Sequence, residues 1–182
     1  IELSFFVDGL SLLFALSIAG IGTFILIYSG AYLKGHPHQG RFLAFMLLFM
    51  GAMQGLVLAD NTVALYAFWE LTTIASFLLI GHWRDQADAR RGARMALLVT
   101  GAGGLALLAG VLLLGQMAGS FKLDVVLAAG DRIRADPAYV PMLLLILLAV
   151  FTKSAQFPWH FWLPEAMAAP TPVSAYLHSA TL

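Results

Sequence analysis

The sequence predicts an all-α fold, a polytopic bundle of transmembrane helices, and three observations support this prediction. Apolar residues make up 60% of the 182 residues and charged residues only 11%, whereas about a quarter of a typical soluble domain is charged. Five apolar stretches reach the roughly 20 residues that a helix needs to cross a bilayer core of about 30 Å. Turn-forming and charged residues gather between these stretches. These features exclude an ordinary soluble domain.

The predicted spans divide the chain into helices of a single membrane domain. The segments between them hold the Gly, Pro, Asp and Asn residues typical of turns at the water interface. The longer segment 119–137, of mixed charge, is a candidate for a short amphipathic helix along the membrane surface. Five full spans and one truncated span are predicted near residues 5–33, 42–59, 62–83, 95–117, 139–163 and 171–182.

The ends of the chain and its basic residues suggest how the segment sits in the membrane. The chain begins at Ile1 without Met and stops within an apolar stretch, so we expect a piece of a longer protein. Alternate loops share a side of the bilayer, and the side richer in Lys and Arg is expected to be cytoplasmic. The two groups are Lys34, Arg41, Arg84, Arg90, Arg91 and Arg94 against Lys122, Arg132 and Arg134.

Charge and composition also limit the partners and cofactors. The net charge is zero, which gives no basic field for nucleic acid. The absence of Cys removes disulfides, thiol nucleophiles and zinc–thiolate sites. His36 and His38 flank a proline in a loop and are too sparse for a metal site. We therefore expect no cofactor and no metal, and a lipid bilayer as the surrounding partner.

Two charged residues inside the apolar spans, Glu70 and Lys153, are the strongest functional candidates. A charge at mid-bilayer costs several kcal/mol and marks a functional site by default. At helical rise, Glu70 lies roughly 13 Å and Lys153 roughly 21 Å below the outer end of its span, and His178 lies roughly 10 Å along the truncated one. An acid, an amine and an imidazole at one level can form a proton relay, since each can exist in either protonation state. Lys suits this role better than Arg, which stays charged.

A helix break is predicted beside the lysine. Pro158 has no N–H and clashes with the carbonyl of residue 154, so the helix is expected to kink or end just after Lys153. Ser154 and Gln156 are candidates to satisfy the freed backbone groups. Such irregular backbone at membrane depth is tolerated where it is buried in protein or lines a wet cavity, as at transporter sites. Pro158 and Pro164 are thus predicted structural or hinge positions.

The remaining polar residues are weaker candidates. His160 follows Lys153 by about two helical turns and either extends the proton path or sits at the interface among tryptophans. Asp60 lies at a span boundary, where a turn role with Asn61 is the better interpretation. Glu165 follows Pro164 near the inner surface, where helix capping is favoured over transport, and Asp8 is a candidate cap of the first span.

Five segments, in this order, resemble the antiporter-like subunits shared by Mrp cation/proton antiporters and respiratory complex I. They read VDGLS at 7–11, FWELT at 68–72, TKSAQFP at 152–158, WLPEAM at 162–167 and PTPVSAYLHSAT at 170–181. Residues 50–53, 58–61, 68–72 and 169–179 look more like the A-type subunit of the Mrp branch than like the complex I counterpart.

This resemblance implies the third to eighth helices of a fourteen-helix core built of inverted five-helix repeats. It implies a proton-handling acid at Glu70, a lysine in a broken helix at Lys153 and a histidine at His178, with a further lysine downstream of this segment. It also implies a secondary transporter subunit, not an enzyme, that moves H⁺ and Na⁺ in a multi-pass complex with other Mrp subunits in a bacterial cell membrane.

Two other functions remain open at this stage. The same relay would serve the proton-pumping membrane subunit of an NADH:quinone oxidoreductase (complex I), and residue spacing does not separate the two. Alternatively, Glu70 and Lys153 form a buried ion pair that only joins two helices. No hydrolase or transferase is expected, because the sequence lacks a nucleophile motif, a metal cluster and a phosphate-binding loop.

Overall fold

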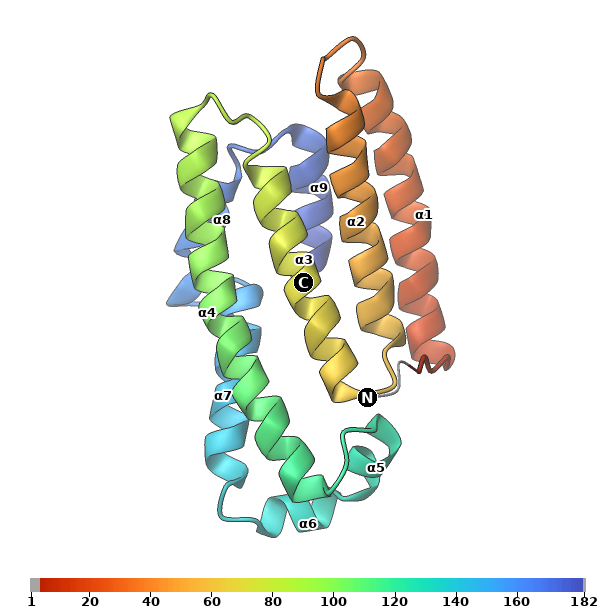
Figure 1. Cartoon of the computed structure of the whole chain (residues 1–182), viewed down its shortest axis with the longest axis vertical. Coiled ribbons are helices and arrows are strands. Elements are labelled where there is room, and N and C mark those ends of the chain that lie inside the picture. Colours follow the sequence, from red (N-terminus) through yellow and green to blue (C-terminus); the bar gives the residue numbers. More distant parts are fainter. Residues whose placement is uncertain (1–3, 182) are drawn as a thin grey trace.

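The computed structural model describes the backbone of residues 4–181 and the side chains of residues 4–177, and its regular elements in that range are helices (Figure 1). This confirms the predicted all-α transmembrane bundle. Four of these helices are long and apolar enough to cross a membrane. They are α1 (Gly9–Tyr32), α2 (Gln39–Leu58), α3 (Thr62–Ile80) and α4 (Ala87–Ala118).

Shorter helices complete the described part of the chain. The segment after α4 folds into two short helices at one end of the bundle, where a single amphipathic helix was the candidate. The predicted fifth span is broken into a helix, a non-helical stretch and two further short helices. In order, these elements are α5 (Leu123–Ala128), α6 (Gly130–Ala135), α7 (Tyr139–Lys153), η1 (Trp159–Phe161), α8 (Trp162–Ala166) and α9 (Thr171–Thr181).

Side chains at two helix starts satisfy the backbone N–H groups that a helix leaves free. Asp8 caps α1 in a capping box, in which its carboxylate accepts from the Ser11 N–H at 2.7 Å and the Ser11 hydroxyl accepts from the Asp8 N–H at 2.8 Å. Asn61 caps α3 by accepting from the N–H groups of Val63 and Ala64. The structure thus gives Asp8 and Asn61 the capping and turn roles proposed for them.

The helices pack around α3 and α4. α2 lies between α1 and α3, whereas α4 contacts α3 on one side and α7 on another (Figure 1). α9 runs along the bundle beside α1 and α3, and its Tyr176 ring lies edge-on to Phe49 at 5.2 Å. Phe42, Met46 and Phe49 of α2 are fully buried. The centre of the bundle is therefore closed by apolar and aromatic side chains.

Apolar side chains also cover the outside of the helices. Phe24 of α1 and Leu98 and Leu105 of α4 are each at least two-thirds exposed. In water such a surface would be an aggregation hazard, whereas in a bilayer it faces hydrocarbon. The chain is therefore a multi-pass membrane segment.

The start of α4 differs from the predicted boundary near residue 95. The helix begins at Ala87, so the arginines of its first two turns project from a helix and not from a loop. Arg91 Nε lies 3.5 Å from Glu165 Oε2 of α8. Helix boundaries predicted from hydropathy miss such turns, because charged residues at a membrane surface can continue a helix into water.

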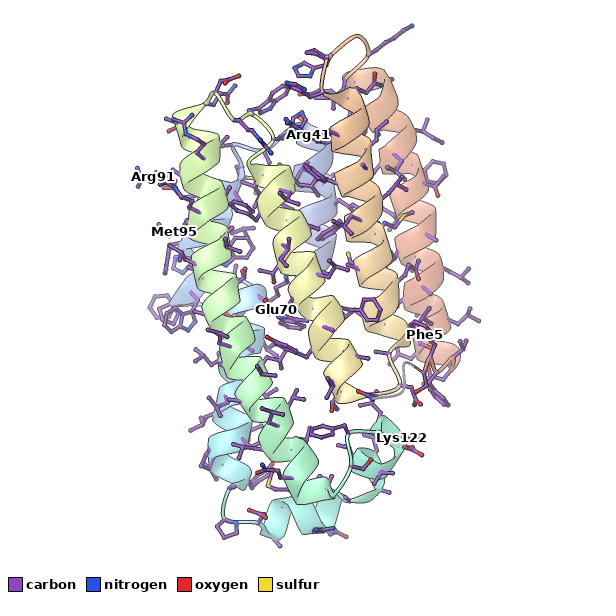
Figure 2. The ribbon with its side chains drawn as sticks, viewed as in Figure 1. Phe5, Arg41, Glu70, Arg91, Met95 and Lys122 are labelled. Atoms are coloured by element: carbon purple, nitrogen blue, oxygen red, sulfur yellow. The ribbon has the colours of Figure 1, made fainter. Side chains whose placement is uncertain are left out.

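Basic residues mark the two ends of the bundle. Figure 2 shows Arg41 and Arg91 near one end and Lys122 at the other. The α1–α2 and α3–α4 connections share the first end, as expected from the alternation of loops (Figure 1).

Candidate functional site: a lysine at a helix break

The helix break lies where the sequence predicts it, directly after Lys153. α7 ends at Lys153 because Ala155 takes up a left-handed backbone conformation with φ of 50°, which interrupts a right-handed helix. The Ser154 hydroxyl donates to the Val150 carbonyl at 2.6 Å, but this carbonyl also accepts from the Ser154 N–H at 2.9 Å and is therefore not one of the freed groups. The Gln156 N–H bonds the Phe151 carbonyl, and Pro158 precedes the short helix η1.

The Thr152 carbonyl also loses its helix partner at the break. It accepts a hydrogen bond from a residue that the sequence analysis did not single out. The Trp162 indole N–H donates to it at 2.9 Å. Trp162 is buried. α8 is held in turn against α4, where the Glu165 carbonyl occupies the space that a Cβ at Gly92 would fill. These contacts hold both sides of the break together.

The Lys153 side chain extends from α7 to α3. Its Nζ donates hydrogen bonds to Thr72 Oγ1 at 2.8 Å and to Thr73 Oγ1 at 3.1 Å. Nζ also lies 5.7 Å from the centre of the Trp69 ring. Among the described residues, these are the contacts of the lysine head group, and they do not include an ion pair with a carboxylate.

Glu70 lies near the middle of α3, between α3 and α4 (Figure 2). A Cβ at Gly104 of α4 would collide with its Oε1, so the carboxylate packs onto a helix surface that only glycine leaves free. In the described part of the chain, Glu70 Oε1 is buried without a hydrogen-bond partner. Glu70 and Lys153 interact electrostatically. The predicted acid and amine are therefore neighbours that are not in direct contact here.

A small cavity lies beside the lysine. Its volume is about 10 Å³, roughly the room that one water molecule needs. Thr73, Ser76 and Thr100 line it together with Lys153, and α9 contributes Leu177. The cavity therefore lies between the lysine and α9, the helix that carries His178. The backbone of His178 is part of α9, but its side chain lies outside the described residues.

The weaker candidates lie away from this cavity. His160 is exposed on η1, where its ring stacks on Phe157 at 5.8 Å. Asp60 accepts a hydrogen bond from the Ser4 hydroxyl at 2.9 Å in the turn before α3. Pro164 lies inside α8, and Glu165 forms the ion pair with α4 described above.

A histidine that sequence reasoning missed lies at the basic end of the bundle. His82 is 3% exposed, and neither ring nitrogen has a hydrogen-bond partner among the described residues. Burial, followed by the positive charge of Arg41 and the neighbouring His36, lowers the pKa of His82 to about 4. The imidazole is therefore neutral at physiological pH. In the described residues no group of three or more His, Asp and Glu could hold a metal ion.

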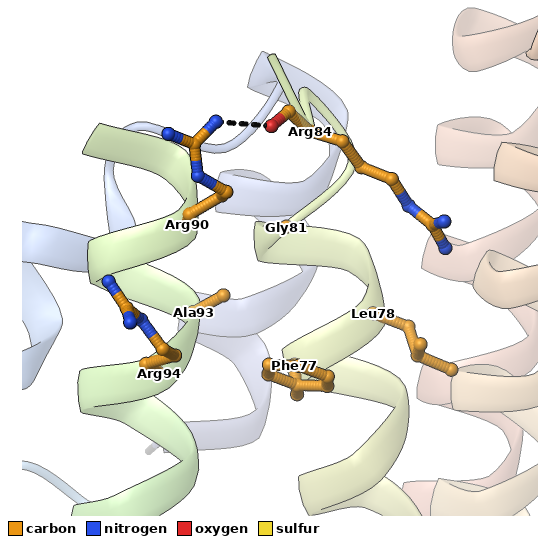
Figure 3. A pocket seen from close by; sticks show the side chains of 7 residues that line it. All are labelled: Phe77, Leu78, Gly81, Arg84, Arg90, Ala93 and Arg94. Atoms are coloured by element: carbon orange, nitrogen blue, oxygen red, sulfur yellow. Dashed lines mark hydrogen bonds between the residues drawn. The ribbon is translucent and has the colours of Figure 1, made fainter. Parts of the chain in front are cut away.

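A larger pocket of about 320 Å³ opens between the ends of α3 and α4, near Arg84, Arg90 and Arg94 (Figure 3). Arg90 Nη1 donates to the Arg84 carbonyl at 2.6 Å, and the Arg84 guanidinium points away from the other two. Because the three charges do not converge, the pocket offers no defined anion site.

The sequence of the chain matches the models of two known families. The family described as NADH:quinone oxidoreductase/Mrp antiporter, TM, matches residues 59–182. The chain belongs to this family. A second family, described as NADH-ubiquinone oxidoreductase (complex I), chain 5 N-terminus, matches residues 1–43.

Several similar proteins are antiporter subunits. The chain is 55% identical over 175 residues to a probable K(+)/H(+) antiporter A/B-type subunit of Rhizobium meliloti, covering 96% of this chain and 18% of that protein. It is 51% identical over 183 residues to the Na(+)/H(+) antiporter A-type subunit of Alkalihalophilus pseudofirmus, covering 100% of this chain and 23% of that protein.

A solved structure, that of the Mrp complex from Dietzia sp. DQ12-45-1b, superposes with a TM-score of 0.87 at 44% identity. It covers 96% of this chain and 19% of the matched chain. These matches confirm the resemblance to the A-type subunit of the Mrp branch. The chain spans about a fifth of the length of these relatives.

Proposed function

We propose that this segment belongs to a proton-translocating subunit of a multisubunit Na⁺/H⁺ antiporter in a bacterial cell membrane. The carrying observation is the partly buried Lys153 side chain at a helix break, with an acid nearby on a neighbouring helix. The names of the similar proteins, which are A-type subunits of Na(+)/H(+) antiporters, support this function. Other antiporter subunits would be its partners, as the match to the Mrp complex suggests.

In the proposed mechanism, Glu70 and Lys153 form a pair that closes and opens. When the pair is open, Lys153 releases its proton through water in the adjoining cavity toward His178 and the groups that follow it. When the pair closes again, the carboxylate favours the ammonium, and Lys153 takes up a new proton. Lys153 thus takes up and releases a proton in each cycle of closing and opening. Such stepwise proton transfer can be coupled to the movement of a cation.

The transported cation is a separate part of this proposal. Na⁺ is named for the relative from Alkalihalophilus pseudofirmus and K⁺ for that from Rhizobium meliloti. We propose Na⁺, and comparison of proton flux driven by each cation in the same vesicles tests this choice. Faster flux with K⁺ would contradict it.

The central test is Lys153→Ala in the full-length chain, assembled with its partner subunits in vesicles. Cation-dependent proton flux is expected to fall to background while the complex still assembles. Lys34→Ala is the matched control, because Lys34 is an exposed loop lysine far from the break. Wild-type flux in an assembled Lys153→Ala complex would reject the relay.

The complex I function remains the second candidate, because the matching family includes NADH:quinone oxidoreductase subunits. The two functions differ in their driving force. Sodium-dependent proton movement in vesicles that lack NADH and quinone supports the antiporter. Proton movement that occurs only during electron transfer supports the oxidoreductase.

A further inference from the structure

We propose that Thr72 and Thr73 form an uncharged docking position for the Lys153 ammonium, the place it occupies when it is separated from Glu70. This inference rests on the proposed function, since it describes where the ammonium is held after it leaves Glu70 and before it releases its proton. The starting observation is the pair of hydrogen bonds from Nζ, at 2.8 Å to Thr72 and 3.1 Å to Thr73.

The two hydroxyl groups are oriented as acceptors. Thr72 Oγ1 donates its hydrogen to the Trp69 carbonyl at 2.7 Å, and Thr73 Oγ1 donates to the same carbonyl at 3.3 Å. Each hydroxyl has one hydrogen, so only its lone pairs are left for Lys153. An ammonium has three donors and no acceptor. The dock therefore matches the protonated lysine and offers no donor to the lone pair of a neutral amine.

The Trp69 ring completes this environment. An ammonium within about 6 Å of an indole centre is attracted by the ring face, and Nζ lies at 5.7 Å. The dock thus combines two lone-pair acceptors and an aromatic face, none of which carries a net charge. It can hold a cation without competing with Glu70 for a proton.

The dock and the acid are close enough to exchange the lysine. Glu70 and Thr73 are three residues apart on α3, a spacing that places their Cβ atoms on neighbouring positions of one helix face, about 5–6 Å apart. The long Lys153 side chain can reach either group by a change of rotamer. A neutral alternative partner lowers the cost of leaving the carboxylate, because the ammonium is never left unsolvated in the membrane interior.

Valine and serine substitutions separate the hydroxyl groups from the shape of the side chains. Thr72→Val with Thr73→Val keeps the volume and removes both acceptors, whereas Thr72→Ser with Thr73→Ser keeps both acceptors. In the full-length assembled antiporter, the double valine variant is expected to lower proton flux about 10-fold, as for loss of a hydrogen bond to a charged group. It is also expected to move the pH optimum of flux. The double serine variant is expected to restore both.

Thr62→Val is the matched control. Thr62 is a buried threonine on the same helix, and its hydroxyl bonds the Phe121 carbonyl far from Lys153. Its pH profile is expected to stay that of the wild type. If the double valine complex fails to assemble, the single variants Thr72→Val and Thr73→Val replace it, and each is expected to shift the profile in part.

The outcomes distinguish the dock from the proposed function. If the valine variants keep wild-type flux and pH profile while Lys153→Ala is inactive, the dock is wrong and the relay stands. Equal losses in the serine and valine variants would also reject the dock, because packing alone would explain them. If Lys153→Ala keeps wild-type flux, the relay fails and the dock fails with it.

Discussion

The indole N–H of Trp162 and the main-chain carbonyl of Thr152 form a hydrogen bond of 2.9 Å that joins the two sides of the broken helix. The carbonyl is free because α7 ends one residue later. At membrane depth there is no bulk water to satisfy it, and an unpaired carbonyl in hydrocarbon costs several kcal/mol. Trp162 therefore allows a helix end to stay open beside Lys153.

Replacing Trp162 with Phe keeps an aromatic ring but removes the N–H that bonds the Thr152 carbonyl. This change is therefore expected to destabilise the protein. A buried carbonyl without its donor lowers the free energy of unfolding by about 1–3 kcal/mol. Detergent-solubilised protein titrated with SDS measures this loss. Trp159→Phe is the control, since Trp159 is 36% exposed. Equal destabilisation by both variants would contradict the role of the hydrogen bond.

Gly104→Ala is expected to impair proton flux more than Gly101→Ala. A Cβ at Gly104 would displace the Glu70 carboxylate, whereas a Cβ at Gly101 meets open space. Both changes add the same methyl group to the same helix, and in a helix interior Ala is preferred over Gly by about 1 kcal/mol. Flux in vesicles, normalised to assembled complex, measures the difference. Equal flux in both variants would show that the position of Glu70 is unimportant.

Ala155→Gly is expected to stabilise the break. Ala155 has a φ of 50°, a left-handed conformation that costs an L-residue about 1–2 kcal/mol and glycine little. Part of this gain is offset by the greater freedom of glycine in the unfolded chain. Ala155→Val is the opposing variant, because a β-branched residue is disfavoured there more strongly. Thermal unfolding in detergent is expected to rank Gly above Ala and Ala above Val.

His82 is expected to make stability depend on pH below about 6.5. In the folded protein its pKa is lowered to about 4, so it stays neutral while the same group in the unfolded chain binds a proton. Stability is therefore unchanged above the ordinary value of 6.5 and falls as the pH decreases from there toward 4. Thermal unfolding between about pH 4.5 and 8 measures how stability changes with pH. This range lies above the folded-state pKa of about 4 and includes the ordinary pKa of 6.5.

His82→Phe is the variant that isolates this effect. It keeps a ring in the same apolar site, where Phe42 packs edge-on at 4.9 Å, and removes the titrating group and two buried ring nitrogens. Its stability is expected to equal or exceed that of the wild type, with a smaller loss at acid pH. If stability depends on pH in the same way in His82→Phe and in the wild type, other groups cause the dependence.

Much of the fold could be predicted from the sequence. The positions and lengths of apolar stretches predict which helices cross a bilayer, because exposing backbone and polar groups to hydrocarbon costs a large free energy. The same free-energy cost identified Glu70 and Lys153 as functional candidates, because charged side chains are disfavoured inside apolar spans. A break near Lys153 was predicted from Pro158, since proline disrupts helix hydrogen bonding locally, and in the structure the left-handed Ala155 interrupts the helix at that point. These conclusions concern single residues and their near neighbours in the chain.

The sequence by itself therefore determined that this chain is a membrane helix bundle with an acid and a lysine in its interior and a helix that ends beside the lysine. Only the tertiary structure decided that Lys153 contacts Thr72 and Thr73, some 80 residues earlier, and that Glu70 packs on Gly104. Such contacts depend on the rotation of each helix about its axis and on side-chain rotamers. Hydropathy does not encode these, because many rotations bury the same apolar residues equally well.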